Sequence, residues 1–182
     1  MLVAVCGLAG AGKTTTVDLL ERLGRGVRVY VGAFVTAEVE RRGLPASPGN
    51  EREVREDLRK QGGMDALARL ALPTIRAIVS TGRVPLIDAI YCVEEYDLYK
   101  VSLDDAIVRL AITATKSERV QRLAARGLRP INADELTKRD AFEFDQLGLR
   151  AVISAAEHTI DNDGTLNDLE ASLKRLQIGG TR

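Results

Sequence analysis

The sequence predicts an α/β fold, in which helices cover both faces of a parallel sheet. Short apolar runs of strand length alternate along the chain with longer segments of helical period. The first run, residues 2–6, is continuously apolar, as expected for a central parallel strand that is covered on both faces. The chain has 182 residues, the length of one domain. We expect a single domain over residues 1–178 and a frayed tail over 179–182.

Five strands are expected from apolar runs, of which the second and third are short and rich in β-branched residues. Their predicted bounds are 2–6, 27–31, 84–87, 106–114 and 158–160. Helical spacing of apolar residues predicts seven helices between and after them. The predicted helices cover residues 14–23, 34–42, 51–60, 65–80, 115–126, 134–147 and 166–176.

Stop and start signals support several of these bounds. Gly43 ends the second helix, and the pair Gly62-Gly63 ends the third. Residues 44–50 carry two prolines and a glycine and are expected to form a loop. Pro73 is expected to kink the helix that contains it. Thr115 and Glu118 have the spacing of a capping box, which opens the next helix.

Composition excludes several classes of protein. Lys plus Arg equals Asp plus Glu at 26 each, which argues against a general binder of nucleic acid or of membrane surfaces. The two cysteines, Cys6 and Cys92, are too few and too far apart for a disulfide framework or a metal site. No apolar stretch approaches ~20 residues, and the N-terminus lacks a basic leader segment. We expect a cytoplasmic protein, either a monomer or a homodimer.

Residues 7–14, Gly-Leu-Ala-Gly-Ala-Gly-Lys-Thr, match the Walker A pattern of a phosphate-binding loop, or P-loop. Glycines let successive backbone N–H groups point at phosphate oxygens, and the following helix adds its positive end. Lys13 supplies charge for the β- and γ-phosphates, and the Thr14 hydroxyl is suited to Mg²⁺. The alternative is a plain glycine-rich turn. The residues predicted to bind ATP are Gly7, Gly10, Ala11, Gly12, Lys13, Thr14 and Thr15.

Other motifs narrow the class of P-loop protein. The two segments that approach GTPase motifs, residues 115–118 and 161–164, come in the wrong order, and Glu118 stands where Asp belongs. A large ring-forming ATPase needs more chain than this for its lid domain. Of the classes of P-loop protein considered, a small kinase is the one that remains.

Asp88 ends the third predicted strand, at the edge of the sheet where ligands bind in open parallel sheets. A carboxylate there can hold the water shell of Mg²⁺ or accept a proton from the acceptor. The alternative is an Asp that caps the next segment. We predict Thr14 and Asp88 as metal ligands, with Asp88 also in a catalytic role.

Arginines dominate the segment after the fourth strand. Arg119, Arg122 and Arg126 lie three and four residues apart on one helical face, followed by Arg129 and Arg139. Arginines stabilise the charge that spreads over the phosphoryl oxygens during transfer. The alternative is a solvated helix face. We predict that Arg122 and Arg126, with Lys13, act in catalysis.

Tyr91, Tyr96 and Tyr99 either line an acceptor pocket or cover the sheet edge.

Together these residues resemble nucleoside-monophosphate kinases and dephospho-coenzyme-A kinases, above all a largely archaeal adenylate-kinase-like set. The resemblance covers nearly the whole chain. Its matches are residues 7–14, 41–43, 58–65 with Arg69, 86–88, 122–127, 139–140 with Glu143, Gly148, and Asn162 with Gly164. It implies a five-stranded sheet in the order 2-3-1-4-5, a lid around 126–136 and an acceptor-binding helical region around 32–80. It also implies that Asn162 lies near the nucleotide base.

Three positions depart from the family pattern. Ala33, Thr36 and Tyr91 stand where the family has an acid and two arginines directed at the acceptor. We therefore expect a small acceptor that carries less charge at that end. The leading hypothesis is transfer of the γ-phosphoryl group of ATP, with Mg²⁺, to a small nucleotide-like or other acceptor. The alternatives are a regulatory or degenerate nucleotide-binding protein and a slow NTPase.

Overall fold

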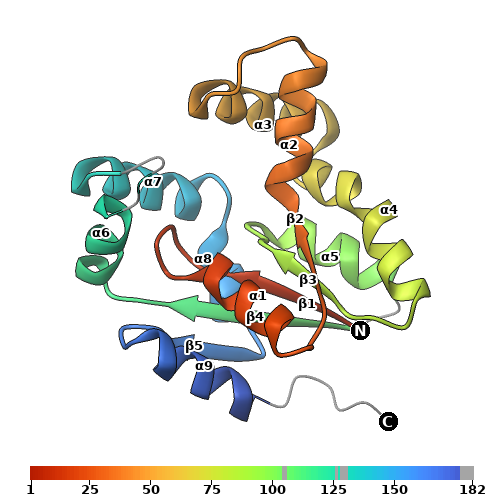
Figure 1. Cartoon of the computed structure of the whole chain (residues 1–182). Helices are drawn as coiled ribbons and strands as arrows, with labels where there is room; N and C mark the ends of the chain where they lie inside the picture. Colours follow the sequence, from red (N-terminus) through yellow and green to blue (C-terminus); the bar gives the residue numbers. More distant parts are fainter. Residues whose placement is uncertain (104–105, 126, 128–130, 177–182) are drawn as a thin grey trace.

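The computed structural model describes residues 1–103, 106–125, 127 and 131–176, and it shows the expected α/β fold. Five parallel strands form one sheet in the order β2-β3-β1-β4-β5 (Figure 1). The order 2-3-1-4-5 implied by the resemblance is therefore confirmed. The strands are β1 Leu2–Cys6, β2 Val27–Tyr30, β3 Pro85–Asp88, β4 Ile107–Thr113 and β5 His158–Asp161.

Helices surround the sheet, and the described residues form more of them than the sequence predicts. They are α1 Lys13–Arg22, α2 Val31–Arg41, α3 Pro48–Gly62, α4 Ala66–Ser80, α5 Val93–Ser102, α6 Lys116–Ala124, α7 Ala133–Asp145, α8 Leu149–Ser154 and α9 Leu166–Arg175. The two unexpected helices are α5 and α8. The predicted tail, 179–182, lies outside the described residues.

Helix α5 carries no apolar period because its buried residues are Glu95 and Tyr99. Helix α8 is separate from α7 because Gly148, with φ of 69°, takes a left-handed conformation between them. The loop predicted over residues 44–50 is partly wrong. Ser47 caps α3 by accepting a hydrogen bond from the Asn50 N–H at 3.1 Å, and Pro48 occupies the first turn, where proline is tolerated.

Alternate residues of β1 supply two separate apolar cores, as a doubly covered strand requires. Leu2, Ala4 and Cys6 belong to the core under α4, α5 and α8. Val3 and Val5 belong to the core under α1 and α9. Cys6 is fully buried, and burial raises the pKa of its thiol to about 12, as expected for an inert core cysteine. Within the described residues no helix is both long and apolar enough to cross a membrane.

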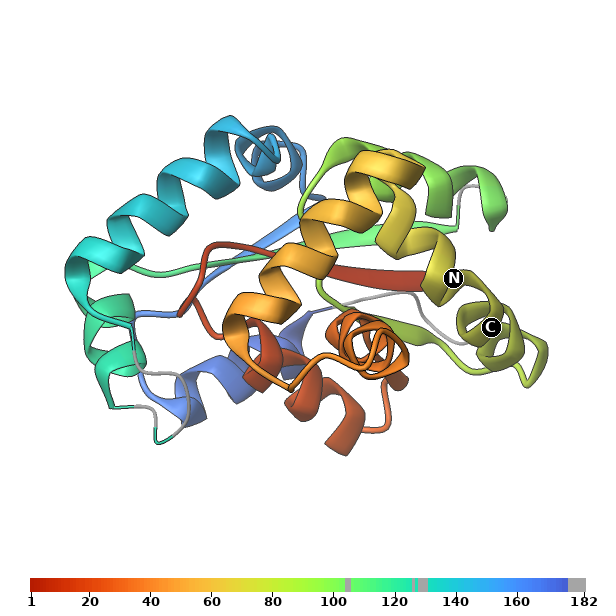
Figure 2. The same ribbon diagram turned by 90° about the horizontal axis from the view of Figure 1, so that it is seen from above.

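The carboxyl ends of β1 and β3 meet at one edge of the sheet, where Val5 and Asp88 are paired in register. The loop from β1 to α1 lies at this edge. Viewed from above, α7 lies to one side of the loop and α3 to the other (Figure 2). Polar side chains from several elements therefore converge around the loop.

Candidate active site

The loop between β1 and α1 has the backbone shape that its glycines allow. Gly7 and Gly12 have φ of 141° and 106°, a region that side chains with a Cβ rarely adopt. A Cβ on Gly7 would lie 2.2 Å from the Ile112 carbonyl oxygen, and one on Gly12 would lie 2.3 Å from Asn162 Nδ2. The loop is thus packed against the ends of β4 and β5 on one side, and these two positions admit only glycine.

Lys13 begins α1 and folds back over the loop. Its Nζ donates to the carbonyl oxygens of Gly7 at 2.7 Å and of Leu8 at 3.0 Å. The residue is 8% exposed, and the ammonium lies 5.4 Å from the centre of the Tyr91 ring. A charge in this position faces both the phosphate-binding loop and the loop that follows β3.

Asp88 and Thr14 come together although they lie 74 residues apart. The Thr14 hydroxyl donates to Asp88 Oδ1 at 3.4 Å, and the other oxygen, Oδ2, accepts from Arg28 Nη2 at 2.7 Å. Arg28 also donates to Asp18 at 2.9 Å. Asp88 is 5% exposed, so its charge requires a counter-charge, which Arg28 supplies. Neither Arg28 nor Asp18 was singled out from the sequence, because a basic residue in a short strand carries no distinctive signal.

The donor set beside the loop fits Mg²⁺. A hydroxyl oxygen from Thr14 and a carboxylate oxygen from Asp88 are hard ligands, and Mg²⁺ typically takes one or two of these with waters and phosphate oxygens. The described residues contain no cluster of three or more acidic, His or Cys side chains. An all-protein cage for a metal is therefore absent from the described part of the chain, whereas a shared protein–phosphate site is compatible with it.

Arg119 has a structural role that the sequence pattern did not reveal. Its guanidinium makes a bidentate pair with Asp140 on α7, at 2.9 and 2.7 Å, and donates to the Ala9 carbonyl oxygen at 3.1 Å. The side chain is only 5% exposed. Arg119 therefore ties α6 and α7 to the loop, and the interpretation of this face as a solvated one is wrong for it.

Arg122 lies apart from Lys13 and Asp88. Its Nη2 donates to the Gly164 carbonyl oxygen at 3.4 Å and lies 3.7 Å from the Glu118 carboxylate. It lines a cavity of about 230 Å³ beside the loop, together with Gly12, Thr15, Asn162, Gly164, Leu166 and Leu169. The predicted partner in catalysis, Arg126, lies outside the described residues, as do residues 128–130 of the predicted lid.

Asn162 supports the loop directly. Its Nδ2 donates to the Ala11 carbonyl oxygen at 2.8 Å, and its backbone N–H donates to the Thr113 carbonyl oxygen at 2.8 Å. The residue is 7% exposed, yet it also lines the cavity that contains Thr15. The resemblance placed Asn162 near the nucleotide base; the structure gives it a bond to the loop backbone, and its role toward the base stays a prediction.

A buried ion pair between Arg59 and Glu95 holds the loop after β3. Glu95 Oε2 accepts from the Tyr91 N–H at 2.7 Å, and Oε1 accepts from Arg59 Nη2 at 3.3 Å. Both Arg59 and Glu95 are nearly inaccessible, with side chains 7% and 4% exposed. Tyr91 is therefore fixed beside Lys13 by its backbone, which leaves its ring facing the site.

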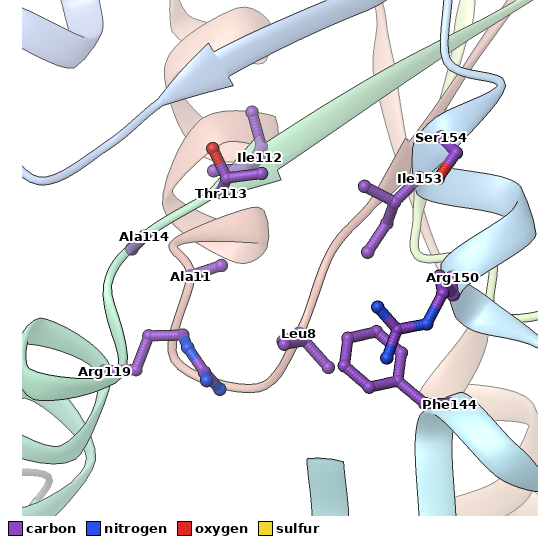
Figure 3. A pocket seen from close by; sticks show the side chains of 10 residues that line it. All are labelled: Leu8, Ala11, Ile112, Thr113, Ala114, Arg119, Phe144, Arg150, Ile153 and Ser154. Carbon is purple, nitrogen blue, oxygen red and sulfur yellow. The ribbon is translucent and has the colours of Figure 1, made fainter. Parts of the chain in front are cut away.

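A second cavity, of about 210 Å³, adjoins the loop on the α8 side (Figure 3). Leu8 lies near its centre, Arg119 at one end, and Arg150 stacks on Phe144 at the other, 4.2 Å from the ring centre. The remaining lining residues are Ala11, Ile112, Thr113, Ala114, Ile153 and Ser154. None of Lys13, Thr14 or Asp88 lines it, so we do not assign it to the phosphate site.

The sheet order, the glycine-rich loop and the adjoining Asp88 define a P-loop protein with a kinase-like fold. A sequence profile of the AAA domain family matches residues 3–142. UPF0200 proteins match over almost the whole chain. One from Thermococcus kodakarensis is 30% identical over 97% of this chain and 96% of its own length, and one from Methanothrix thermoacetophila is 31% identical over 95% and 94%. The chain belongs to the AAA domain family and to the UPF0200 proteins.

Solved structures share the fold at low sequence identity. A shikimate kinase from Bacteroides thetaiotaomicron superposes with a TM-score of 0.61 and 15% identity, covering 97% of this chain and 96% of that one. A gluconokinase from Sinorhizobium meliloti gives 0.57 and 14%, covering 96% and 91%. At these identities the likeness shows the fold, which small-molecule kinases also use.

Proposed function

We propose that the protein is an ATP-dependent kinase that transfers the γ-phosphoryl group to a small-molecule acceptor. The observation that carries the proposal is the pairing of Thr14 with Asp88 at 3.4 Å, beside the Lys13 ammonium. Together these residues place two oxygen ligands suited to a metal, and a cation suited to phosphate, at one edge of the sheet. A plain glycine-rich turn would require none of these groups.

In this proposal the loop N–H groups and Lys13 bind the β- and γ-phosphates. Thr14 and Asp88 would hold Mg²⁺, which would offset the charge of the phosphates. An oxygen of the acceptor bonds to the γ-phosphorus while the bond from that phosphorus to the bridging oxygen of ADP breaks. Any proton on the acceptor oxygen passes to water, because Oδ1 of Asp88 faces the metal site and Oδ2 is bonded by Arg28.

Other residues support the donor nucleotide. Asn162 keeps the loop in shape through Ala11, and Arg122 borders the cavity that reaches Thr15 and Gly164. We assign this cavity to the sugar and base of the nucleotide. Arg126 and the segment 126–136 retain their proposed role as a lid, and the helices within 32–80 their role beside the acceptor.

Hydrolysis of the nucleotide is the second candidate, and the match to the AAA domain family favours it. Consumption of ATP separates the candidates. With ATP, Mg²⁺ and pooled small-molecule acceptors, a kinase forms ADP well above the rate without acceptors. An equal rate with and without acceptors would indicate an NTPase, and no ADP in either case would indicate a protein that only binds nucleotide. Lys13→Ala provides the background rate.

A further inference from the structure

Three arginines occupy one face of α3. Arg52, Arg55 and Arg59 are spaced three and four residues apart, so their side chains lie on the same side of the helix. Arg52 is the outermost, with a side chain 72% exposed, Arg55 is half-buried, and Arg59 is buried against Glu95. The Arg52 guanidinium lies 5.9 Å from the centre of the Phe142 ring, so this face of α3 looks toward α7.

Helix α7 presents a matching arginine. Arg139 lies three residues before Phe142, on the same helical face, and its side chain is 42% exposed. Its Nε donates to Glu143 Oε1 at 2.8 Å. Partial burial lowers the pKa of Arg139, but the neighbouring Tyr91 and Glu143 outweigh this and raise it overall. Arg139 is therefore close to Tyr91, which contacts the donor site through Lys13.

Within the described part of the chain, Arg55 is the member of this group for which no bonded partner is seen. Arg59 is paired with Glu95, and Arg139 with Glu143. Among the described residues Arg55 makes no hydrogen bond or ion pair, although the Glu51 carboxylate is near enough to act on it. Burial lowers the pKa of Arg55; the neighbouring Tyr91 opposes this, and the charges of Arg59 and Arg139 lower the pKa further. A bound anion would supply a directly bonded counter-charge, which the described residues do not give Arg55.

We propose that Arg55 and Arg139 form an anion-binding site for the acceptor, which therefore carries a carboxylate or a phosphate group. The inference rests on the proposed kinase function and names the substrate class of that site. With its anion between α3 and α7, the acceptor would extend along Tyr91 toward Lys13 and Asp88. This site differs from the family pattern, whose two arginines fall at Thr36 and Tyr91. The Thr36 hydroxyl here bonds the Gly32 carbonyl oxygen of its own helix.

The proposed site argues against the expectation that the acceptor carries little charge. That expectation counted only the family's positions, Ala33, Thr36 and Tyr91. Arg55 and Arg139 become neighbours of Tyr91 only once α3 and α7 are placed on either side of the loop (Figure 2). Nothing in their sequence spacing links them.

Isothermal titration of the full chain saturated with ADP and Mg²⁺ tests the site. The probes are inorganic phosphate and two matched pairs, AMP against adenosine and gluconate against glucose. We expect one anionic member to bind at least about tenfold more tightly than its neutral counterpart. Arg55→Ala should weaken that binding about ten- to a hundredfold. Arg52→Ala, one turn further out on the same face, should leave it unchanged.

Two further variants guard against loss of fold. Arg55→Lys should restore part of the affinity, and Arg139→Gln should reproduce the loss; unchanged ADP affinity shows that each variant is folded. No preference for the anion in any pair, or equal binding by Arg55→Ala and Arg52→Ala, would overturn the site. Anion binding through Arg55 without any ATP consumption would instead refute the kinase proposal. Turnover of a neutral compound at a rate that Arg55→Ala does not change would refute the anion site but not the kinase proposal.

Discussion

The donor side and the acceptor side of the site are built in different ways. On the donor side, Lys13, Asn162 and Arg119 all bond to backbone carbonyls of the phosphate loop. On the acceptor side, Tyr91, Arg55 and Arg139 come from three separate segments, and the side chains of Glu95 and Glu143 hold Tyr91 and Arg139. The triphosphate group has the same shape in every nucleotide, so the backbone N–H groups of a loop with fixed shape can recognise it. An acceptor recognised only by side chains can differ between proteins that share the fold.

The largest expected effect lies on the donor side. Lys13→Ala removes the cation that faces both phosphates and acceptor, so we expect kcat to fall by about 10³ and ATP affinity to weaken. Isothermal titration with ATP and Mg²⁺, together with single-turnover assays, measures both. Lys174→Ala, an exposed lysine on α9, is the control and should behave as the wild type. Wild-type affinity and activity in Lys13→Ala would remove the loop from the donor site.

Asp88→Asn should be nearly as damaging, because it removes a metal ligand and leaves Arg28 with one carboxylate. We expect kcat to fall about a hundredfold or more, and the Mg²⁺ concentration needed for half-maximal rate to rise. Asp18→Asn is the matched control, since Asp18 bonds the same arginine and is 46% exposed. Both variants should lose some stability, but only Asp88→Asn should lose activity. Equal loss of activity in both would show that Asp88 acts only through Arg28.

Substitution of the two arginines on α6 should affect different properties, stability for Arg119 and nucleotide binding for Arg122. Arg119→Ala leaves Asp140 without its buried partner, so we expect a loss of about 3 kcal/mol in the free energy of unfolding. In a chain of this length that lowers Tm by roughly 10 °C. Arg122→Ala should cost about 0.5 kcal/mol but raise KM for ATP. Thermal melts measure the change in Tm, and steady-state kinetics measure KM for ATP. An Arg119→Ala variant as stable as the wild type would contradict the anchoring role.

The smallest effect concerns pH and the ion pairs of the acceptor-side helices. Hydrogen bonds from Arg41, and then from Arg42, lower the pKa of Glu38 to about 2 from 4.5. Because the folded state binds this proton more weakly than the unfolded state, the stabilisation is present above pH 4.5 and is lost as pH falls toward 2. Glu38→Gln should therefore have a lower Tm than the wild type near neutral pH. The difference should vanish near pH 2, and a difference that grows in acid would reverse the assignment.

The placement of Lys13, Thr14 and Asp88 around one loop could be predicted from the sequence because its signals are local. The glycines, Lys13 and Thr14 lie within one short motif, and Asp88 ends an apolar run whose place in the sheet follows from the fold. Helix α5 and the ion pair of Arg59 with Glu95 were missed because the buried face of that helix carries an acid. The role of Arg119 was missed because its partners, Ala9 and Asp140, are distant in sequence.

The central claim is that the γ-phosphoryl group moves from ATP to an acceptor that extends along Tyr91 from Arg55 and Arg139. Phosphorus NMR of the protein with ATP, Mg²⁺ and an anion that binds through Arg55 tests it directly. We predict a new phosphorylated product in equal amount to the ADP formed, absent in Lys13→Ala and strongly reduced in Arg55→Ala. ADP accompanied only by inorganic phosphate, at a rate that the acceptor does not change, would contradict the account.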